Sequence, residues 1–337
     1  MRLADFDYEL PDERIAQHPI EPRDSARLLV DQGSASPLHR QVSDLGEFLC
    51  DGDVLVVNDT RVIPARLRLR RATGGGAEVL LLEPLDGERR TWEAMVRGAK
   101  KMKAGEELLG SDDSPLVRVQ RRSDAGDTMI VELLGEGDPL QLLEAHGEMP
   151  LPPYITARLD EPERYQTVYS QQPASSAAPT AGLHLTPALL QSFETRGIDI
   201  ARVELVVGLD TFKPVSADDP RDHAIHSERY RVPAETAAAC ADARRVVAVG
   251  TTSVRALESA AQFGAAEGRT RLFIHRPYEW QTVDVMMTNF HLPRTTLLMM
   301  IDAFVGPRWR ALYEVALREQ YRFLSFGDAM LLDRSLT

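Results

Sequence analysis

Residues 246–255 carry the clearest local signal for chemistry, because an apolar strand, a glycine turn and the start of a helix follow one another there. The first turn of a helix offers free backbone N–H groups, which favour a carboxylate or phosphate. Arg255 adds a forked donor that suits the same anion. The segment predicts an anion site made of Gly250, Thr251, Thr252, Ser253 and Arg255. On spacing alone the simpler interpretation, in which Ser253 only caps the helix, is favoured.

Two further segments place histidines beside small or acidic residues. The run A-P-T-A-G-L-H contains Thr180 and Gly182 and ends at His184. Its small residues let a ligand approach closely, and a histidine can act as a base or donor near neutral pH. His226 and Glu228 offer an acid and a base in a second segment, where few helix formers and no third ligand argue against a metal site. A loop without a chemical role is the alternative for both segments.

A fourth segment combines an amide and a histidine at the end of a predicted strand. Asn289 and His291 precede a helix that is expected to begin near Thr295. The ends of strands in open α/β sheets are where ligands bind. The alternative is a strand-to-helix turn that asparagine and proline hold in place.

A dense group of cations, four in seven residues, is formed by Arg97, Lys100, Lys101 and Lys103. The whole chain is acidic, with a formal net charge of −12, which argues against a nucleic-acid binder. Residues 61–122, however, hold 14 Lys or Arg against 9 Asp or Glu, which leaves −17 for the rest of the chain. Such a cationic segment suits contact with a phosphate backbone, although a solvated face is the more usual explanation.

The elements that must position these residues fall into two patterns. Short alternating or apolar runs separated by turn clusters occupy residues 62–134 and predict a small antiparallel β-barrel or sandwich. Helix and strand patterns alternate after residue 153, which predicts a three-layer α/β domain with a largely parallel sheet. We therefore expect a discontinuous α/β catalytic domain of residues 1–62 and 156–337, interrupted by an inserted β-barrel domain of residues 63–155.

Composition limits the classes of protein that remain. The 337 residues suffice for two domains with a substantial core. No apolar run approaches ~20 residues, so a membrane span is not expected. The two cysteines, Cys50 and Cys240, form neither a metal-ligand pair nor a disulfide framework, which favours a reducing cytoplasm.

Taken together and in this order, the segments resemble one family, the S-adenosylmethionine:tRNA ribosyltransferase-isomerases of queuosine biosynthesis. The resemblance also rests on longer motifs at residues 23–30, 52–67, 149–155, 164–169 and 321–330. It implies an α/β fold with an inserted β-barrel. It also implies two substrates, S-adenosylmethionine and a tRNA that carries 7-aminomethyl-7-deazaguanine at the wobble position. The implied products are epoxyqueuosine-tRNA, adenine and methionine, with no metal and no cofactor beyond the consumed S-adenosylmethionine.

This chemistry needs a base for the 5′ carbon beside the sulfonium, an acceptor for the proton of the attacking amine, and a donor to the departing adenine. The acid and base candidates are His184, His226, Glu228, Glu258 and His291. The expected S-adenosylmethionine contacts are Thr180, Gly182, Gly250, Thr251, Thr252, Ser253, Arg255 and Asn289. The expected tRNA contacts are Arg61, Arg66, Arg97, Lys100, Lys101 and Lys103.

Two other functions are compatible with the same residues. A non-catalytic relative would bind tRNA in a salt-dependent way without releasing adenine. A small-molecule transferase would use the S-adenosylmethionine pocket without RNA. The chain also departs from the family pattern at Val206, where a histidine is frequent, and at Asp210, where a glycine is frequent.

Overall fold

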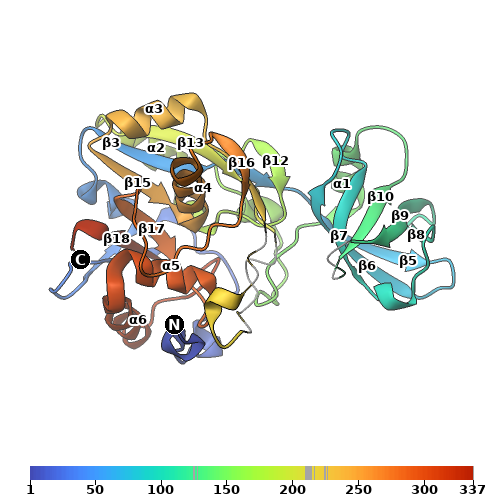
Figure 1. The fold of residues 1–337 in the computed structure, drawn as a ribbon, viewed down its shortest axis with the longest axis horizontal. Coiled ribbons are helices and arrows are strands. Elements are labelled where there is room, and N and C mark those ends of the chain that lie inside the picture. The colour runs from blue at the N-terminus through green and yellow to red at the C-terminus, as the bar shows by residue number, and fades with distance from the viewer. Residues whose placement is uncertain are drawn as a thin grey trace. The chain divides into compact units, whose positions relative to one another are not determined.

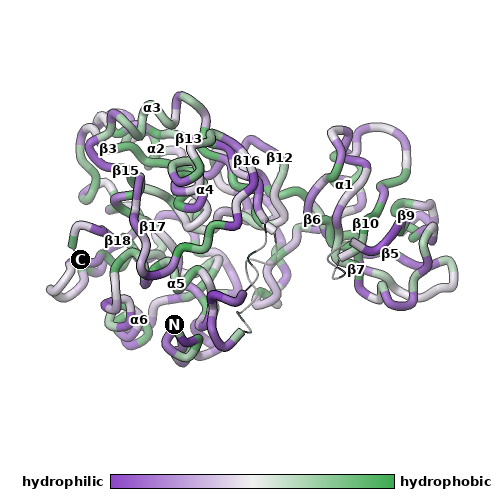
Figure 2. Tube along the Cα trace, in the orientation of Figure 1, coloured by the Kyte–Doolittle hydropathy of each residue, from purple (hydrophilic) through white to green (hydrophobic). Residues whose placement is uncertain are grey.

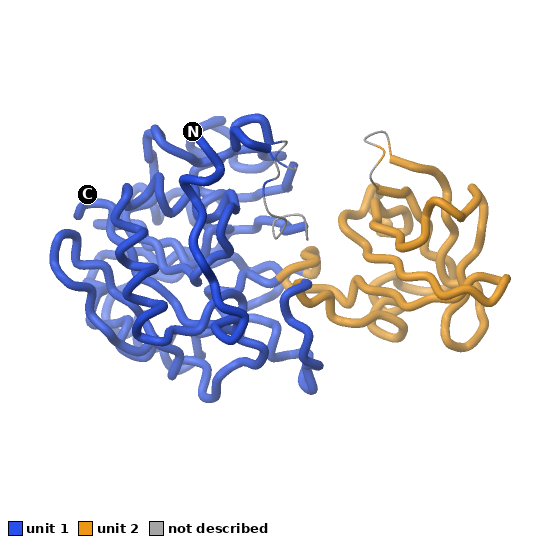
Figure 3. Tube along the Cα trace, turned by 90° about the horizontal axis from the view of Figure 1, so that it is seen from below, with its two compact units in different colours: residues 1–60, 153–172, 178–337 blue, residues 61–152, 173–177 orange. Residues whose placement is uncertain are grey.

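The structure is a computed structural model that describes residues 1–123, 126, 128–208, 215, 217–223, 225 and 227–336. Its contacts divide the chain into two compact units, coloured separately in Figure 3. The α/β unit comprises residues 1–60, 153–172 and 178–337, and the barrel unit comprises residues 61–152 and 173–177. His226 and Asp210 lie outside the described residues.

A nine-stranded sheet runs through the α/β unit in the order β16-β14-β13-β3-β15-β17-β18-β1-β2 (Figure 1). These strands are β1 (Arg27–Val30), β2 (Leu38–Gln41), β3 (Asp53–Asn58), β13 (Asp199–Leu205), β14 (Glu228–Arg231), β15 (Arg245–Val249), β16 (Glu267–Thr270), β17 (Val285–Asn289) and β18 (Ala329–Asp333). β4 (Thr60–Val62) and β12 (Gln172–Ser175) form a separate two-stranded sheet.

The nine-stranded sheet is mixed, which corrects the prediction of a largely parallel one. β13, β3, β15 and β17 are parallel to one another, and β18 is parallel to β1. β17 and β18 are antiparallel, as are the pairs β1–β2, β13–β14 and β14–β16. The connection from β1 to β2 is too short for the crossover that parallel strands require. The carboxyl ends of β3, β15 and β17 nevertheless meet at one edge.

Buried apolar side chains explain why the central strands form. Every residue of β3 is buried, as expected for a strand covered on both faces. On one face, Leu55, Val247 and Met287 pack with Leu189 and Phe193. Hydrophobic stretches run through the interior of each unit in Figure 2. The apolar runs of residues 53–57 and 246–249 predict buried strands, and the structure confirms both.

The helices of the α/β unit are α2 (Pro187–Glu194), α3 (Ala234–Asp242), α4 (Gly250–Phe263), α5 (Thr296–Val305) and α6 (Trp309–Arg318). Thr186 caps α2 and Thr295 caps α5, each by accepting the N–H three residues on. Periodicity predicts helices at about residues 186–196, 234–244 and 253–263 and from about residues 295 and 307, and all five agree with the structure to within a few residues. It also predicts a helix that begins at Pro11, but only a 3₁₀ turn, Asp12–Arg14, follows there. Among the described residues no helix has the length and apolar character that a bilayer crossing requires.

The barrel unit contains a closed ring of six antiparallel strands in the order β5-β6-β7-β10-β9-β8, with β8 pairing back to β5. The unit's strands are β5 (Arg66–Arg71), β6 (Gly76–Pro84), β7 (Thr91–Arg97), β8 (Glu107–Leu109), β9 (Pro115–Arg122), β10 (Met129–Leu133) and β11 (Gly147–Glu148), and α1 spans Pro139–His146. Leu67 and Leu69 of β5 point inward between outward-facing arginines. The expected antiparallel barrel is thereby confirmed. The sequence runs at residues 66–70, 79–82, 117–120 and 129–134 correspond to β5, β6, β9 and β10, whereas no such run marks β7 and β8.

Candidate active site

A pocket lies in the α/β unit where β15 and β17 end. The empty space within it is about 630 Å³, counting space open to solvent. Six of the predicted site residues line it, namely Thr180, Gly250, Thr251, Thr252, Asn289 and His291. They come from three separate stretches of the chain, which β15, β17 and the 3₁₀ turn Thr180–His184 bring to one place.

The glycine turn forms one wall of this pocket. Gly250 has φ +86°, a conformation that side chains rarely adopt, and α4 begins there. Thr251 and Thr252 therefore sit in the first turn of a fourteen-residue helix. Ser253 is already inside the helix and donates its Oγ hydrogen to the Val249 carbonyl at 2.8 Å. The interpretation of Ser253 as a helix cap is wrong, because Val249 occupies the cap position.

Asn289 lines the pocket and also contacts His184 and Asp328, which do not line it. Its Oδ1 accepts the Thr180 hydroxyl at 2.9 Å, and its Nδ2 lies 3.2 Å from His184 Nε2 and 3.3 Å from the Asp328 carbonyl. His184 is buried and does not line the pocket. Burial and the nearby Arg322 guanidinium lower the pKa of His184 to about 4, so the ring is neutral at pH 7.

His291 lies in the pocket wall, and its Nε2 is 2.9 Å from Thr288 Oγ1. Its backbone is fixed on both sides, because Tyr8 donates to its carbonyl and its N–H donates to Tyr313. Burial lowers the pKa of His291 to about 3, which leaves this imidazole uncharged as well. Of the predicted histidines in the described part of the chain, His291 is the one whose residue reaches the pocket surface.

Gly182 and Tyr169 touch directly. A Cβ at position 182 would overlap the Tyr169 hydroxyl, so only glycine fits. Gly182 is buried and lies outside the lining of the pocket, on the same turn as Thr180. Its part in the site is therefore to let that turn pack closely.

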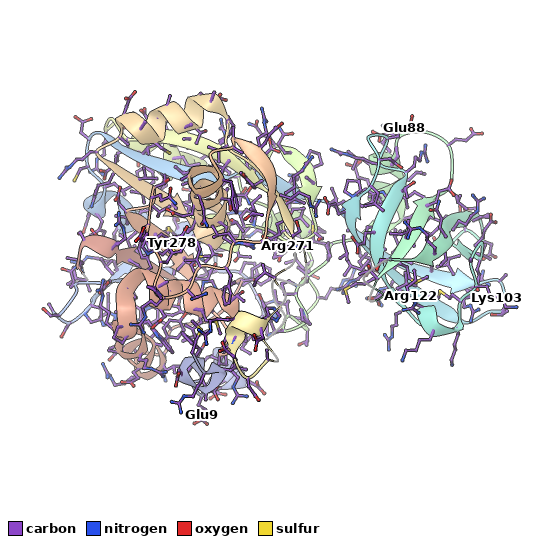
Figure 4. The ribbon with its side chains drawn as sticks, viewed as in Figure 1. Glu9, Glu88, Lys103, Arg122, Arg271 and Tyr278 are labelled. Atoms are coloured by element: carbon purple, nitrogen blue, oxygen red, sulfur yellow. The ribbon has the colours of Figure 1, made fainter. Side chains whose placement is uncertain are left out.

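The two predicted carboxylates have different surroundings. Glu228 forms an ion pair with Arg255 of α4, and both side chains are buried. Glu258, one turn further along α4, is fully buried and accepts hydrogen bonds from three backbone N–H groups of residues 281–283 and from the Tyr278 hydroxyl. Figure 4 labels Tyr278. Glu258 does not line the pocket, and these four donors give it a structural environment.

Sequence reasoning did not select several pocket residues. Tyr154 and Ser325 line the pocket, with their hydroxyl oxygens 2.7 Å apart. Leu324 beside them has φ +69°, which is strained for a branched side chain and typical of functional sites. These three residues lie within the family motifs of residues 149–155 and 321–330, but no neighbouring residue marks Tyr154, Leu324 or Ser325 as part of a pocket.

The cationic residues of the barrel unit divide into paired and unpaired side chains. Arg66 lies 3.8 Å from Glu78 and donates to the Leu151 carbonyl. Arg61 lies in β4 and is half-buried. The side chains of Arg97, Lys100, Lys101 and Lys103 are exposed and form no close ion pair in the part of the unit that is described, although the charge of Lys103 helps to lower the pKa of Glu106. Figure 4 shows Lys103 on this unit.

Known proteins are similar in sequence to this chain over nearly its whole length. The sequence model of the family described as "Queuosine biosynthesis protein" matches residues 3–332. The S-adenosylmethionine:tRNA ribosyltransferase-isomerase of Symbiobacterium thermophilum is 49% identical over 344 residues, covering 98% of this chain and 100% of the relative. The protein of that name in Thermus thermophilus is also 49% identical, over 346 residues that cover 98% of this chain and 99% of the relative.

A solved structure agrees with these sequences. The crystal structure of S-adenosylmethionine tRNA ribosyltransferase from Thermotoga maritima has a TM-score of 0.55 and 37% sequence identity, and it covers 97% of this chain and 99% of that chain. Both the sequence matches and this structure extend over both units of the molecule. The resemblance stated from the motifs is thus confirmed, and the chain belongs to the queuosine biosynthesis protein family.

Proposed function

We propose that this chain is an S-adenosylmethionine:tRNA ribosyltransferase-isomerase. It transfers and isomerises the ribosyl group of S-adenosylmethionine onto 7-aminomethyl-7-deazaguanine of tRNA, with release of adenine and methionine. The observation that carries the proposal is near-full-length identity of 49% to relatives of that name, combined with a pocket into which three predicted motifs converge. S-adenosylmethionine is a consumed substrate, and no other cofactor enters the proposal.

The pocket at the ends of β15 and β17 is the proposed S-adenosylmethionine site. Thr251 and Thr252 offer backbone N–H groups and hydroxyls at the start of α4, where a carboxylate is favoured. Thr252 Oγ1 is buried without a hydrogen-bond partner among the described residues, so a polar ligand group would satisfy it. Arg255 lies one turn further along α4, and its Nε and Nη2 are also buried without a hydrogen-bond partner among the described residues. These groups support a site for the methionine carboxylate at the glycine turn.

Proton transfer requires neutral or anionic acceptors near the sugar. His291 reaches the pocket and is unprotonated at neutral pH, so it can accept a proton from the 5′ carbon or the incoming amine. A pKa of about 3 makes it a weak base, so this role requires a bound group that raises the pKa toward the working pH. Glu228 lies beside Arg255 and remains a candidate, as does His226, which is outside the described residues. Glu258 is not part of the proposed acid–base set, because four donors already occupy its oxygens.

The exposed cations of the barrel unit are the proposed tRNA contacts. Three of the chain's four lysines lie within residues 100–103, and an unpaired cation is free to replace a counterion on RNA. Arg66 already contacts a carboxylate, so it contributes less to this surface than Arg97 does. Because the substrate is tRNA, we place the enzyme in the cytoplasm.

Catalysis and RNA binding belong to separate domains in this proposal. We assign catalysis to an α/β domain of residues 1–62 and 156–337 and RNA binding to an inserted domain of residues 63–155. α2 packs in the core cluster on one face of the sheet, while α4 contacts β13, β15 and β17. These contacts support three layers, with the mixed sheet in the middle.

One incubation tests the function. The protein is mixed with S-adenosylmethionine and tRNA bearing 7-aminomethyl-7-deazaguanine, and adenine is measured. Adenine release that depends on this tRNA is expected. Release without any RNA would identify a small-molecule transferase instead. Binding of the tRNA without adenine would identify a non-catalytic relative.

A further inference from the structure

Asn289 is clamped by two residues of one 3₁₀ turn, Thr180 at its beginning and His184 at its end. The amide has a third neighbour, the backbone carbonyl of Asp328, 3.3 Å from Nδ2. Asn289 is 3% exposed and His184 is 4% exposed, and the contacts of the amide with His184 and with the Asp328 carbonyl are both buried. The hydrogen-bond roles of all three side chains follow from this arrangement.

The Asp328 carbonyl fixes the orientation of the amide. A backbone carbonyl has no proton to give, so the atom of Asn289 that faces it must be the donor Nδ2. With the amide turned over, Oδ1 would face that carbonyl, and two acceptors would repel each other at a distance of 3.3 Å. The same Nδ2 therefore directs its second hydrogen at His184 Nε2, 3.2 Å away.

This orientation in turn fixes His184 and Thr180. His184 Nε2 must be an acceptor, which places the ring proton on Nδ1 and keeps the imidazole neutral. Burial and the positive charges of Arg322, Arg164 and Arg23 oppose protonation of the ring. Asn289 Oδ1 then faces Thr180, whose single hydroxyl proton is donated to it at 2.9 Å. The Thr180 hydroxyl has no further proton to offer the pocket.

We infer that His184 is a positioning residue, which holds Asn289 so that the Thr180 hydroxyl presents only acceptor lone pairs to the pocket. The ligand group seated at that hydroxyl must consequently be an N–H or O–H donor. This inference rests on the proposed function for the identity of the ligand. S-adenosylmethionine carries such donors on the ribose, on the adenine 6-amino group and on the α-ammonium. A lone-pair acceptor such as an adenine ring nitrogen does not fit there.

Binding of S-adenosylmethionine, measured by calorimetry without tRNA, tests the acceptor role. Thr180→Val keeps the shape and removes the acceptor, so we expect the dissociation constant to rise about tenfold. Thr180→Ser keeps the hydroxyl and should remain within about threefold of the wild type. Thr236→Val is the matched control, because the buried Thr236 also donates one side-chain hydrogen bond, 2.6 Å to the Arg202 carbonyl, but lies outside the pocket. Unchanged binding by Thr180→Val would overturn the inference.

Two variants at position 184 test the positioning role. Gln can place an acceptor where Nε2 lies, whereas Leu cannot. We expect His184→Leu to raise the Michaelis constant for S-adenosylmethionine about tenfold with a smaller effect on kcat, and His184→Gln to recover most of that loss. The pH profile of kcat should keep its shape in His184→Gln. Loss of one limb of that profile, with kcat lost equally in both variants, would show proton transfer by His184 and overturn the inference.

Analogues of S-adenosylmethionine identify the donor. One analogue lacks the 6-amino group, one lacks a ribose hydroxyl and one lacks the α-ammonium. The analogue without the donor that contacts Thr180 should bind wild type and Thr180→Val equally, as in a double-mutant cycle. Wild-type protein that binds S-adenosylmethionine but releases no adenine would overturn only the proposed function. If the wild type releases adenine and Thr180→Val binds S-adenosylmethionine as tightly as the wild type does, only the inference is overturned.

Discussion

Arg255 of α4 and Glu228 of β14 form an ion pair in which both residues are buried, 8% and 6% exposed. The pair uses Nη1 of the guanidinium, and Nε and Nη2 have no hydrogen-bond partner among the described residues. Buried donors of this kind normally have partners, so we propose an anion as the partner of Nε and Nη2, although Arg255 itself does not line the pocket. Arg255 lies one turn after Thr251 and Thr252, which line the pocket.

Replacing Arg255 tests the proposed carboxylate site. We expect Arg255→Ala to raise the Michaelis constant for S-adenosylmethionine tenfold to about a hundredfold, the range for losing a hydrogen bond to a charged group. An unchanged constant would refute the site. Glu228→Gln is the companion variant, because it leaves Arg255 in place without its counterion. We expect that variant to lose about 3 kcal/mol of unfolding free energy in urea titrations.

Glu258 is expected to stabilise the fold. Its oxygens accept from Tyr278 and from the backbone N–H groups of residues 281–283, and it is completely buried. Glu258→Gln turns an amide N–H₂ toward some of these donors, so we expect a loss of about 2–4 kcal/mol in the free energy of unfolding. Urea denaturation measures this loss. Full stability together with lost adenine release would instead indicate an acid–base role.

The buried histidines make stability depend on pH. The folded-state pKa is lowered to about 4 at His184 and to about 3 at His291, so the unfolded chain binds protons more readily below pH 6.5. The contribution to stability is therefore complete above that pH and is lost as the pH falls. For His184 alone we expect about 2 kcal/mol to be lost between pH 7.5 and 5. Urea titrations at the two pH values measure the change.

Asp59 acts in the opposite direction. Burial and the nearby Glu204 raise the pKa of Asp59 to about 6, so the stability it contributes at low pH is lost as the pH rises through that value. We expect Asp59→Asn to make the loss of stability at pH 5 larger, and His184→Gln to make it smaller. The same slope in both variants and in the wild type would contradict this assignment.

The unpaired lysines of the barrel unit should control RNA binding. Replacing Lys100, Lys101 and Lys103 together with alanine removes three exposed cations. We expect weaker tRNA binding and a shallower dependence of log Kd on log salt, by about one unit for each phosphate that a lysine no longer neutralises. S-adenosylmethionine binding should be unchanged. Arg68→Ala is a suitable control, since Arg68 is exposed but already paired with Glu148 at 2.8 Å. An unaltered salt slope in the triple variant would place the RNA elsewhere.

The sequence determined the elements whose signals are local. The apolar run at β3, the caps at Thr186 and Thr295 and the alternation of leucine with arginine in β5 each depend on neighbours within a few positions. Such periodicity is visible in the chain itself. Convergence of the glycine turn and the Asn289 segment could also be anticipated, because parallel strands end at one edge.

The tertiary structure decided what each polar side chain does. His184 and Asn289 are 105 positions apart in the sequence, and only folding brings the amide of Asn289 within hydrogen-bond distance of His184 Nε2. Glu258 and the backbone donors at residues 281–283 meet in the same way, and so do the carboxylates that pair with Arg66 and Arg68. The hydrogen-bond role and charge of a buried group depend on the partners and the dielectric around it. Neither the partners nor the dielectric can be predicted from the residues that are near such a group in the sequence.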